Sequence, residues 1–130
     1  MKFSKPADLT KQMHEKIPLS KAMEVRIEKV SESGVILSAP LAPNINHKKT
    51  AFGGSVHSAA VLSCWALVTE VVKDFDVDYV VIQDSEIDYV EPVDGDFTAE
   101  SSWVKSGDRE KFIETLEKRG LARATLIAEV

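Results

Sequence analysis

The chain has 130 residues, of which 44% are hydrophobic and 28% charged, as in ordinary globular domains. Its formal net charge of -5 and the lack of a basic stripe argue against nucleic acid as a partner, because a protein that binds nucleic acid must neutralise many phosphates. The N-terminus lacks the apolar core of a signal peptide, and nothing around the single cysteine, Cys64, resembles a metal or redox motif. We therefore expect one cytoplasmic domain, residues 1–130, with no metal and no cofactor.

The first part of the chain predicts one helix, a hairpin and a long loop. Residues 6–17 carry apolar side chains at helical spacing. Apolar side chains nearly alternate over residues 23–30, and a second apolar run covers residues 35–41, which predicts two paired strands. Residues 42–54 are rich in Pro, Asn, Lys and Gly and show no periodicity. Loops of this length often carry function.

The middle of the chain predicts one buried helix. Residues 55–73 are apolar at almost every angle, as a helix that is buried on most sides requires. The longest apolar stretch within it, residues 59–68, is shorter than the roughly 20 residues that span a bilayer. We therefore expect a core helix and no membrane partner.

The last part predicts three strands and a short helix. Residues 79–93 are rich in β-branched side chains, and with residues 97–104, which follow a closing turn, they predict a second hairpin. A short helix that carries Phe112 and ends at Gly120 should follow, before a fifth strand within residues 122–130. This order of elements predicts an α+β fold in which a curved antiparallel sheet wraps around one long helix.

The loop delivers two glycines, Gly53 and Gly54, to the start of the long helix. The first N–H groups of a helix have no internal partners and carry the positive end of its dipole, so they can hold a carbonyl oxygen that becomes negative. Glycines also let a ligand approach the backbone closely. The alternative is that the pair only permits a tight turn, with Ser55 as an ordinary helix cap.

Several nearby side chains have both a chemical and a structural interpretation. Asn44 and Asn46 could orient a water or a thioester carbonyl, but asparagine also commonly bonds its own loop backbone. His57 could serve as a base, although a structural role is more common. Ser63 and Cys64 lie in mid-helix without an adjacent base, which predicts packing residues.

Three acidic residues alternate along the predicted strand over residues 79–93, namely Asp84, Glu86 and Asp88. Paired carboxylates could perform acid-base chemistry, but a solvated strand face is the commoner explanation. We therefore expect no catalysis from this group.

The sequence also resembles a known family, the thioesterases related to the YiiD C-terminal domain. The resemblance covers nearly the whole chain and is carried by SAPLAPNIN (38–46), TAFGGS (50–55), IPLS (17–20), Trp65, IDYVEPV (87–93) and GLAR (120–123). It implies a hotdog fold with five or more strands. It also implies a homodimer or a dimer of dimers, with acyl-CoA sites at the subunit boundary beside a helix N-terminus.

Two departures limit what the resemblance carries over. Phenylacetate-type hotdog thioesterases have a His before the two glycines and an Asp on the helix that activates water, whereas this chain has Phe52 and Val61 there. Glu70 lies about 24 Å along the helix from Gly54, at 1.5 Å per residue, so it is no simple substitute. The chain also ends inside an apparent strand, at residues 129–130, whereas the family usually continues through one more.

The resulting expectation is hydrolysis of an acyl-CoA or acyl-carrier thioester. The amides of Gly53 or Gly54 would donate to the oxyanion, while Asn46, together with Asn44, would position water or the carbonyl. The residues expected to contact the substrate are Phe52, Ser55, His57, Lys48 and Lys49, and the two lysines, with Arg119 and Arg123, are candidates for the phosphates of coenzyme A.

Two other functions fit the same residues. A non-catalytic module that binds acyl-CoA or fatty-acyl groups would keep the pocket without hydrolysis, as the missing helix acid would allow. A hotdog dehydratase or hydratase would need a His and Asp pair near the helix start, and His57 has no acidic neighbour in the sequence.

Overall fold

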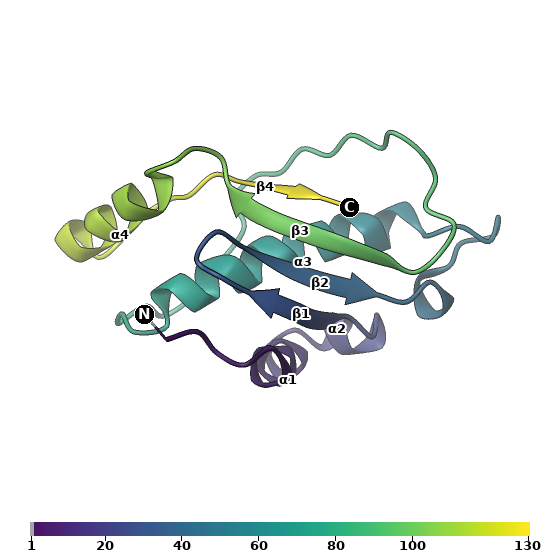
Figure 1. The fold of residues 1–130 in the computed structure, drawn as a ribbon, viewed down its shortest axis with the longest axis horizontal. Helices are drawn as coiled ribbons and strands as arrows, with labels where there is room; N and C mark the ends of the chain where they lie inside the picture. Colours follow the sequence, from purple (N-terminus) through teal and green to yellow (C-terminus); the bar gives the residue numbers. More distant parts are fainter. Residues whose placement is uncertain (1) are drawn as a thin grey trace.

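The structure, a computed structural model, describes residues 2–130 and combines an antiparallel sheet with one long helix (Figure 1). In chain order its elements are α1 (Pro6–Lys16), α2 (Pro18–Ala22), β1 (Arg26–Val30), β2 (Gly34–Ala39), the 3-10 helix η1 (Ala42–Asn44), α3 (Gly53–Val72), β3 (Phe97–Trp103), α4 (Asp108–Arg119) and β4 (Leu126–Glu129). The predicted α+β class and the predicted central helix are confirmed.

The four strands form one sheet in the order β1-β2-β3-β4. β2 pairs with β3 from Gly34, opposite Ser102, to Ala39, opposite Phe97. A side chain at Gly34 would place its Cβ 2.0 Å from the carbonyl oxygen of Ser101, so the close approach of these strands requires glycine at this position. On the far side of β4 no strand lies among the described residues, which leaves this edge of the sheet open.

The core lies between the sheet and α3, which crosses behind it in Figure 1. Alternate side chains of β2, Val35, Leu37 and Ala39, are buried toward the helix. α3 presents small side chains such as Ala59 and Ala66, both fully buried, which let the helix lie close to the strands. By length and composition alone α3 could also cross a membrane, but half of it is buried inside this fold, as in the core helix of a globular domain.

The first two helices flank the β1 edge of the sheet (Figure 1). α1 buries Leu9 and Met13 in the core, which confirms the helix predicted over residues 6–17. The hydroxyl of Thr10 accepts a 2.8 Å hydrogen bond from the backbone N–H of Ile27, so α1 also bonds directly to β1. The separate short helix α2 was not predicted.

The predicted strand over residues 79–93 is wrong, and so is the hairpin that it would form with the next strand. Residues 77–96 form no ladder, and every residue from 81 to 90 is exposed. In Figure 1 this extended segment arches away from the sheet between α3 and β3. A strand requires a neighbour for its backbone hydrogen bonds, and β propensity alone does not supply one. The described residues therefore contain four strands and not the predicted five or more.

The other end of α3 holds a buried carboxylate. Glu70 is only 2% exposed, and its Oε1 accepts hydrogen bonds from Lys73 Nζ and from the backbone N–H of Ser4, each at 2.6 Å. Burial raises the pKa of Glu70, but the bonds from Lys73 and Ser4 outweigh it and hold the pKa below its ordinary value. Glu70 therefore fastens the N-terminal segment to the end of the helix.

A Glu70→Gln variant should be less stable than the parent at pH 7 by about 1 to 3 kcal/mol, because the buried carboxylate loses its charge-assisted hydrogen bonds with Lys73 and Ser4. Since the folded-state pKa is lowered, the carboxylate stabilises the protein above its ordinary pKa of 4.5, and this contribution is lost as the pH falls through the lower folded value. Urea denaturation at neutral and acidic pH measures the difference. An exposed Glu117→Gln variant is the control, and equal stability of the Glu70 variant and the parent at pH 7 would contradict this role.

Candidate active site at the start of the central helix

The N-terminus of α3 carries two backbone N–H groups without partners. The residue before the helix is Phe52, whose side chain caps nothing, while its carbonyl accepts from the N–H groups of Ser55 at 2.9 Å and Val56 at 3.1 Å. Within residues 2–130, the N–H groups of Gly53 and Gly54 have no hydrogen-bond partner. The alternative that Ser55 is an ordinary cap is wrong, because no side chain caps this helix.

The loop before the helix is held in place by backbone bonds. Ile45 and Ala51 form an antiparallel bridge that closes the loop on itself. The N–H of Phe52 donates to the carbonyl of Asn44 at 2.7 Å, and the N–H of Ala51 donates to the carbonyl of Val93 at 2.7 Å. The helix start is therefore tied both to η1 and to the end of the extended segment 77–96.

Asn44 is buried, with 2% of its surface exposed, and its amide connects three parts of the chain. Its Nδ2 donates to the carbonyl oxygens of Met23 at 2.9 Å and Pro40 at 2.8 Å. Its Oδ1 is buried without a hydrogen-bond partner among the described residues. The structure thus gives Asn44 a clear positioning role for the loop.

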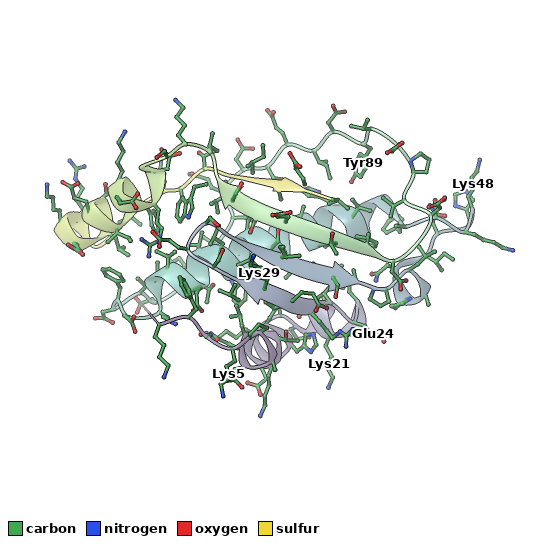
Figure 2. The ribbon with its side chains drawn as sticks, viewed as in Figure 1. Lys5, Lys21, Glu24, Lys29, Lys48 and Tyr89 are labelled. Atoms are coloured by element: carbon green, nitrogen blue, oxygen red, sulfur yellow. The ribbon has the colours of Figure 1, made fainter. Side chains whose placement is uncertain are left out.

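The side chain of Asn46 folds back on its own loop. Its Oδ1 accepts from the backbone N–H groups of Lys48 at 2.8 Å and Thr50 at 3.1 Å, and its Nδ2 donates to Thr50 Oγ1 at 2.8 Å. This is the local bonding that asparagine commonly makes in loops. Lys48 and Lys49 are exposed beside it, and Figure 2 shows Lys48 projecting from the tip of the loop.

Two exposed aromatic rings flank the first turn of α3. The ring of Phe52 covers Gly54, where an added Cβ would lie 2.5 Å from its Cε2 atom. The ring of Tyr89 lies beside Gly53, 3.5 Å from the corresponding Cβ position, and its hydroxyl donates to the Gly53 carbonyl at 2.8 Å. Tyr89, labelled in Figure 2, comes from the extended segment 77–96. Tyr89 was not predicted as a site residue, although it lies within the IDYVEPV stretch of the resemblance.

A second contact joins the same two segments one turn further along the helix. His57 Nε2 lies 3.0 Å from Ser85 Oγ, within hydrogen-bonding distance. Since Tyr89 meets Gly53 and Ser85 meets His57, the extended segment runs antiparallel to the first turns of α3. Ser85 was not predicted as a site residue, because nothing in the local sequence connects it with a position 28 residues earlier.

The serine and cysteine in the middle of α3 are packing residues, as predicted. Ser63 is fully buried and its hydroxyl donates to the carbonyl of Ala60 at 2.7 Å, while its own carbonyl accepts from Ser101 Oγ at 2.8 Å. Burial raises the pKa of the Cys64 thiol, which disfavours the nucleophilic thiolate. Neither residue takes part in the arrangement around Gly53 and Gly54.

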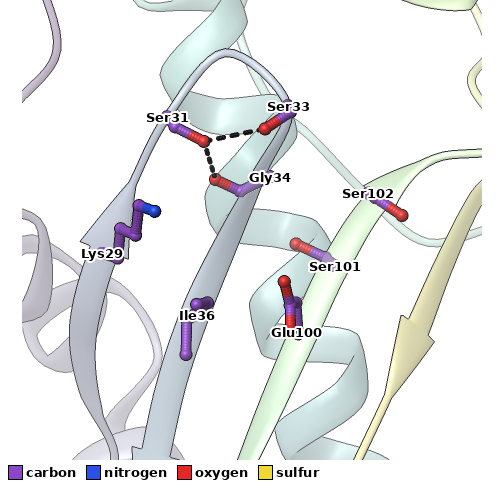
Figure 3. Close-up of a pocket in the computed structure, with 8 residues that line it drawn as sticks. All are labelled: Lys29, Ser31, Ser33, Gly34, Ile36, Glu100, Ser101 and Ser102. Atoms are coloured by element: carbon purple, nitrogen blue, oxygen red, sulfur yellow. Dashed lines mark hydrogen bonds between the residues drawn. The ribbon is translucent and has the colours of Figure 1, made fainter. Parts of the chain in front are cut away.

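Two hollows in the surface lie elsewhere. One, of about 160 Å³, lies beside the turn between β1 and β2 and is lined by residues that include Lys29, Ser31, Glu100 and Ser102 (Figure 3). The other, of about 230 Å³, lies between α4 and the segment before β4, and Arg123 lines it. Neither is lined by a residue of the loop before α3, whereas the Phe52 and Tyr89 rings at the helix start are exposed.

The chain matches, over residues 6–130, the family described as "Putative thioesterase (yiiD_Cterm)". It belongs to this family. The resemblance found in the sequence is therefore confirmed, and the YiiD C-terminal family places the chain among proteins described as thioesterases.

Solved structures with the same fold include two that are described as thioesterases. A protein of unknown function from Chlorobaculum tepidum TLS is 34% identical, over 93% of this chain and 75% of that one, with a TM-score of 0.84. A putative thioesterase from Shewanella oneidensis is 28% identical, over 82% of this chain and 77% of that one, with a TM-score of 0.70. A probable thioesterase from Pseudomonas aeruginosa, 22% identical over 98% and 85% with a TM-score of 0.74, shares the fold.

In this member of the YiiD C-terminal family no carboxylate of α3 reaches the helix start. The only acidic residue of the helix is Glu70, and it is bonded to Lys73 and Ser4 near the other end. Val61, one of the positions considered above for a catalytic acid, is an apolar, half-buried side chain.

Proposed function

We propose that the protein hydrolyses acyl thioesters of coenzyme A or of an acyl-carrier protein at the N-terminus of α3. The observation that carries this proposal is the pair of unpartnered N–H groups at Gly53 and Gly54. Attack on a thioester gives its carbonyl oxygen a negative charge, and donors already in place stabilise that charge by roughly 3 to 4 kcal/mol. Membership of a thioesterase family supports the same reaction class.

The residues around the two amides have distinct proposed roles. The exposed ring of Phe52 offers an apolar wall to the acyl group, with Ser55 and His57 on the following turn. Lys48 and Lys49 at the loop tip are candidates for the phosphates of coenzyme A. Asn44 and Asn46 would contribute by holding the loop, because their Nδ2 groups already bond to loop and strand atoms.

We also propose that the acting species is a homodimer, or a dimer of such dimers. The support is the open edge of β4 together with a run of exposed apolar side chains along the extended segment: Tyr79, Val81, Ile82, Ile87, Tyr89 and Val90. Exposed apolar runs and open strand edges mark interaction surfaces. A single-chain mass at micromolar concentration in sedimentation equilibrium would contradict a dimer.

The second candidate is a module that binds acyl-CoA or fatty-acyl groups without hydrolysing them. It is favoured by one observation, the absence of any acidic side chain other than Glu70 on α3. Thiol release measured across acyl-CoA substrates of increasing chain length separates the two candidates. Release supports hydrolysis, binding without release supports the module, and the absence of both would contradict both.

A Tyr89→Phe variant should lower kcat about 3- to 10-fold with little change in KM. The Tyr89 hydroxyl donates to the carbonyl of Gly53, and that carbonyl belongs to the same peptide group as the Gly54 N–H. Hydrogen bonds in series polarise one another, so the Tyr89 bond strengthens the Gly54 donor. Steady-state kinetics with the best acyl-CoA measures the effect. Tyr79→Phe, an exposed change on the same segment, is the matched control, and unchanged kcat in Tyr89→Phe would remove the hydroxyl from the mechanism.

A further inference from the structure

The proposed reaction still needs a group that activates water. One candidate pair, His57 and Ser85, lies near the N-terminus of α3, where the thioester would bind. Gly53 and His57 are four residues apart in the helix, so their side-chain directions share one face, one turn apart. His57 Nε2 lies 3.0 Å from Ser85 Oγ, while Nδ1 has no hydrogen-bond partner in the described chain. His57 thus has one ring nitrogen held by a hydroxyl and the other free to accept a proton.

We propose that His57 is the general base of the thioesterase, with Ser85 as the residue that positions it, an inference that rests on the proposed function. The Ser85 hydroxyl can accept a hydrogen bond from Nε2–H across the 3.0 Å contact, and the proposed mechanism uses this arrangement. With Nε2–H donating to Ser85 Oγ, Nδ1 carries the lone pair. The serine therefore orients the ring, as the third member of a hydrolase triad orients its histidine.

The step balances without any further reactant. Nδ1 of His57 takes a proton from water while the water oxygen forms a bond to the thioester carbonyl carbon, and the carbonyl oxygen becomes negative beside the Gly53 and Gly54 N–H groups. When the carbonyl re-forms, the C–S bond breaks. The imidazolium returns its proton to the departing sulfur, which leaves as a thiol. The products are a carboxylic acid and a thiol.

Other groups that could act in place of His57 lie on the same extended segment. Asp84 and Glu86 flank Ser85 in the sequence, and both are exposed without an ion pair among residues 2–130. Tyr89 is engaged with the Gly53 carbonyl. Within residues 2–130, neither Asp84 nor Glu86 makes a hydrogen bond or ion pair with His57, whose bonded neighbour is Ser85.

The test compares His57→Gln and Ser85→Ala with the parent, using acyl-CoA hydrolysis between pH 5 and pH 9. The parent rate should rise with pH, because only a neutral imidazole can accept a proton from water. His57→Gln should lower kcat about 10²- to 10⁴-fold and abolish that rise. Ser85→Ala should keep the rise of the rate with pH but lower kcat several-fold. Ser85→Thr retains a hydroxyl and should therefore have a kcat close to that of the parent. Asp84→Asn and Glu86→Gln should match the parent.

The controls are His47→Gln and Ser106→Ala, which alter exposed residues of the same types. Thermal unfolding shows whether each variant is folded. Because Ser85 lies on an exposed segment, its substitution should not unfold the protein. Nitrogen-15 NMR of the His57 ring gives a second measurement, because Ser85→Ala should shift the tautomer balance even without substrate.

The outcomes separate this inference from the proposed function. If the parent hydrolyses thioesters and His57→Gln keeps both its rate and its pH profile, His57 is not the base while the thioesterase stands. The inference is also overturned if Asp84→Asn or Glu86→Gln, and not His57→Gln, abolishes turnover. If the parent releases no thiol from any substrate, the proposed function fails, and this role of His57 fails with it.

Discussion

A Gly54→Ala substitution should lower kcat/KM for thioester hydrolysis about 100-fold while leaving the protein at least as stable as the parent. The added Cβ would lie 2.5 Å from the Phe52 ring, so the ring must move, and the Cβ and the displaced ring would crowd the N–H groups that should receive the oxyanion. Loss of one such donor typically costs 10²- to 10³-fold in rate. Alanine itself suits a helix better than glycine, by about 1 kcal/mol, and Gly54 has no left-handed backbone to strain.

Two variants show whether crowding at the helix start is the cause. Gly95→Ala is the matched control, because nothing lies within 4 Å of a Cβ at that position. A double variant, Phe52→Ala with Gly54→Ala, removes the colliding ring and should recover part of the lost rate. Full activity of the single Gly54→Ala variant would exclude the helix start as the site of reaction.

An Asn44→Ala variant should be less stable than the parent by about 2 to 4 kcal/mol. The buried carbonyl oxygen of Met23 and the partly buried one of Pro40 would lose their hydrogen-bond donor, and a small cavity would replace the amide. Urea denaturation measures this change. Asn46→Ala, at a more exposed position of the same loop, should cost less than half as much, because its partners can bond to water instead.

The same pair of variants separates a structural from a catalytic role of the asparagines. If Asn44 only holds the loop, Asn44→Ala should lose activity because the loop is less ordered. That activity, measured per folded molecule, should recover when a ligand or low temperature stabilises the fold. A variant as stable as the parent but inactive would instead show that the Asn44 side chain acts directly on the substrate.

Local sequence patterns account for most of the fold. The central helix was predicted over residues 55–73 and spans Gly53–Val72 in the structure. The prediction succeeded because a continuous apolar pattern and an adjacent glycine pair mark this helix clearly. The last helix ends at Gly120, whose φ of 71° is the left-handed conformation that terminates helices. The segment 79–93 was mispredicted because its β-branched composition resembles a strand, whereas strand formation depends on a neighbour that local sequence does not encode.

The candidate site was predicted only in part. The glycine pair at the helix start follows from the loop and the apolar run, and the structure adds that no side chain caps it. Tyr89 and Ser85 were missed as site residues because their contacts with Gly53 and His57 span 36 and 28 positions in the chain. The roles of the two asparagines were undecided in the sequence, since only the fold shows where their Nδ2 groups donate.

The extended segment 77–96 should be the part of the protein that opens most easily. It makes no ladder bonds, and its contacts with the helix come from a few side chains, so its amides should exchange with solvent quickly while those of α3 exchange slowly. A protease should cut there first. A nicked molecule would keep its sheet and helix but lose Tyr89 and Ser85 from the helix start, so activity should disappear before the fold does.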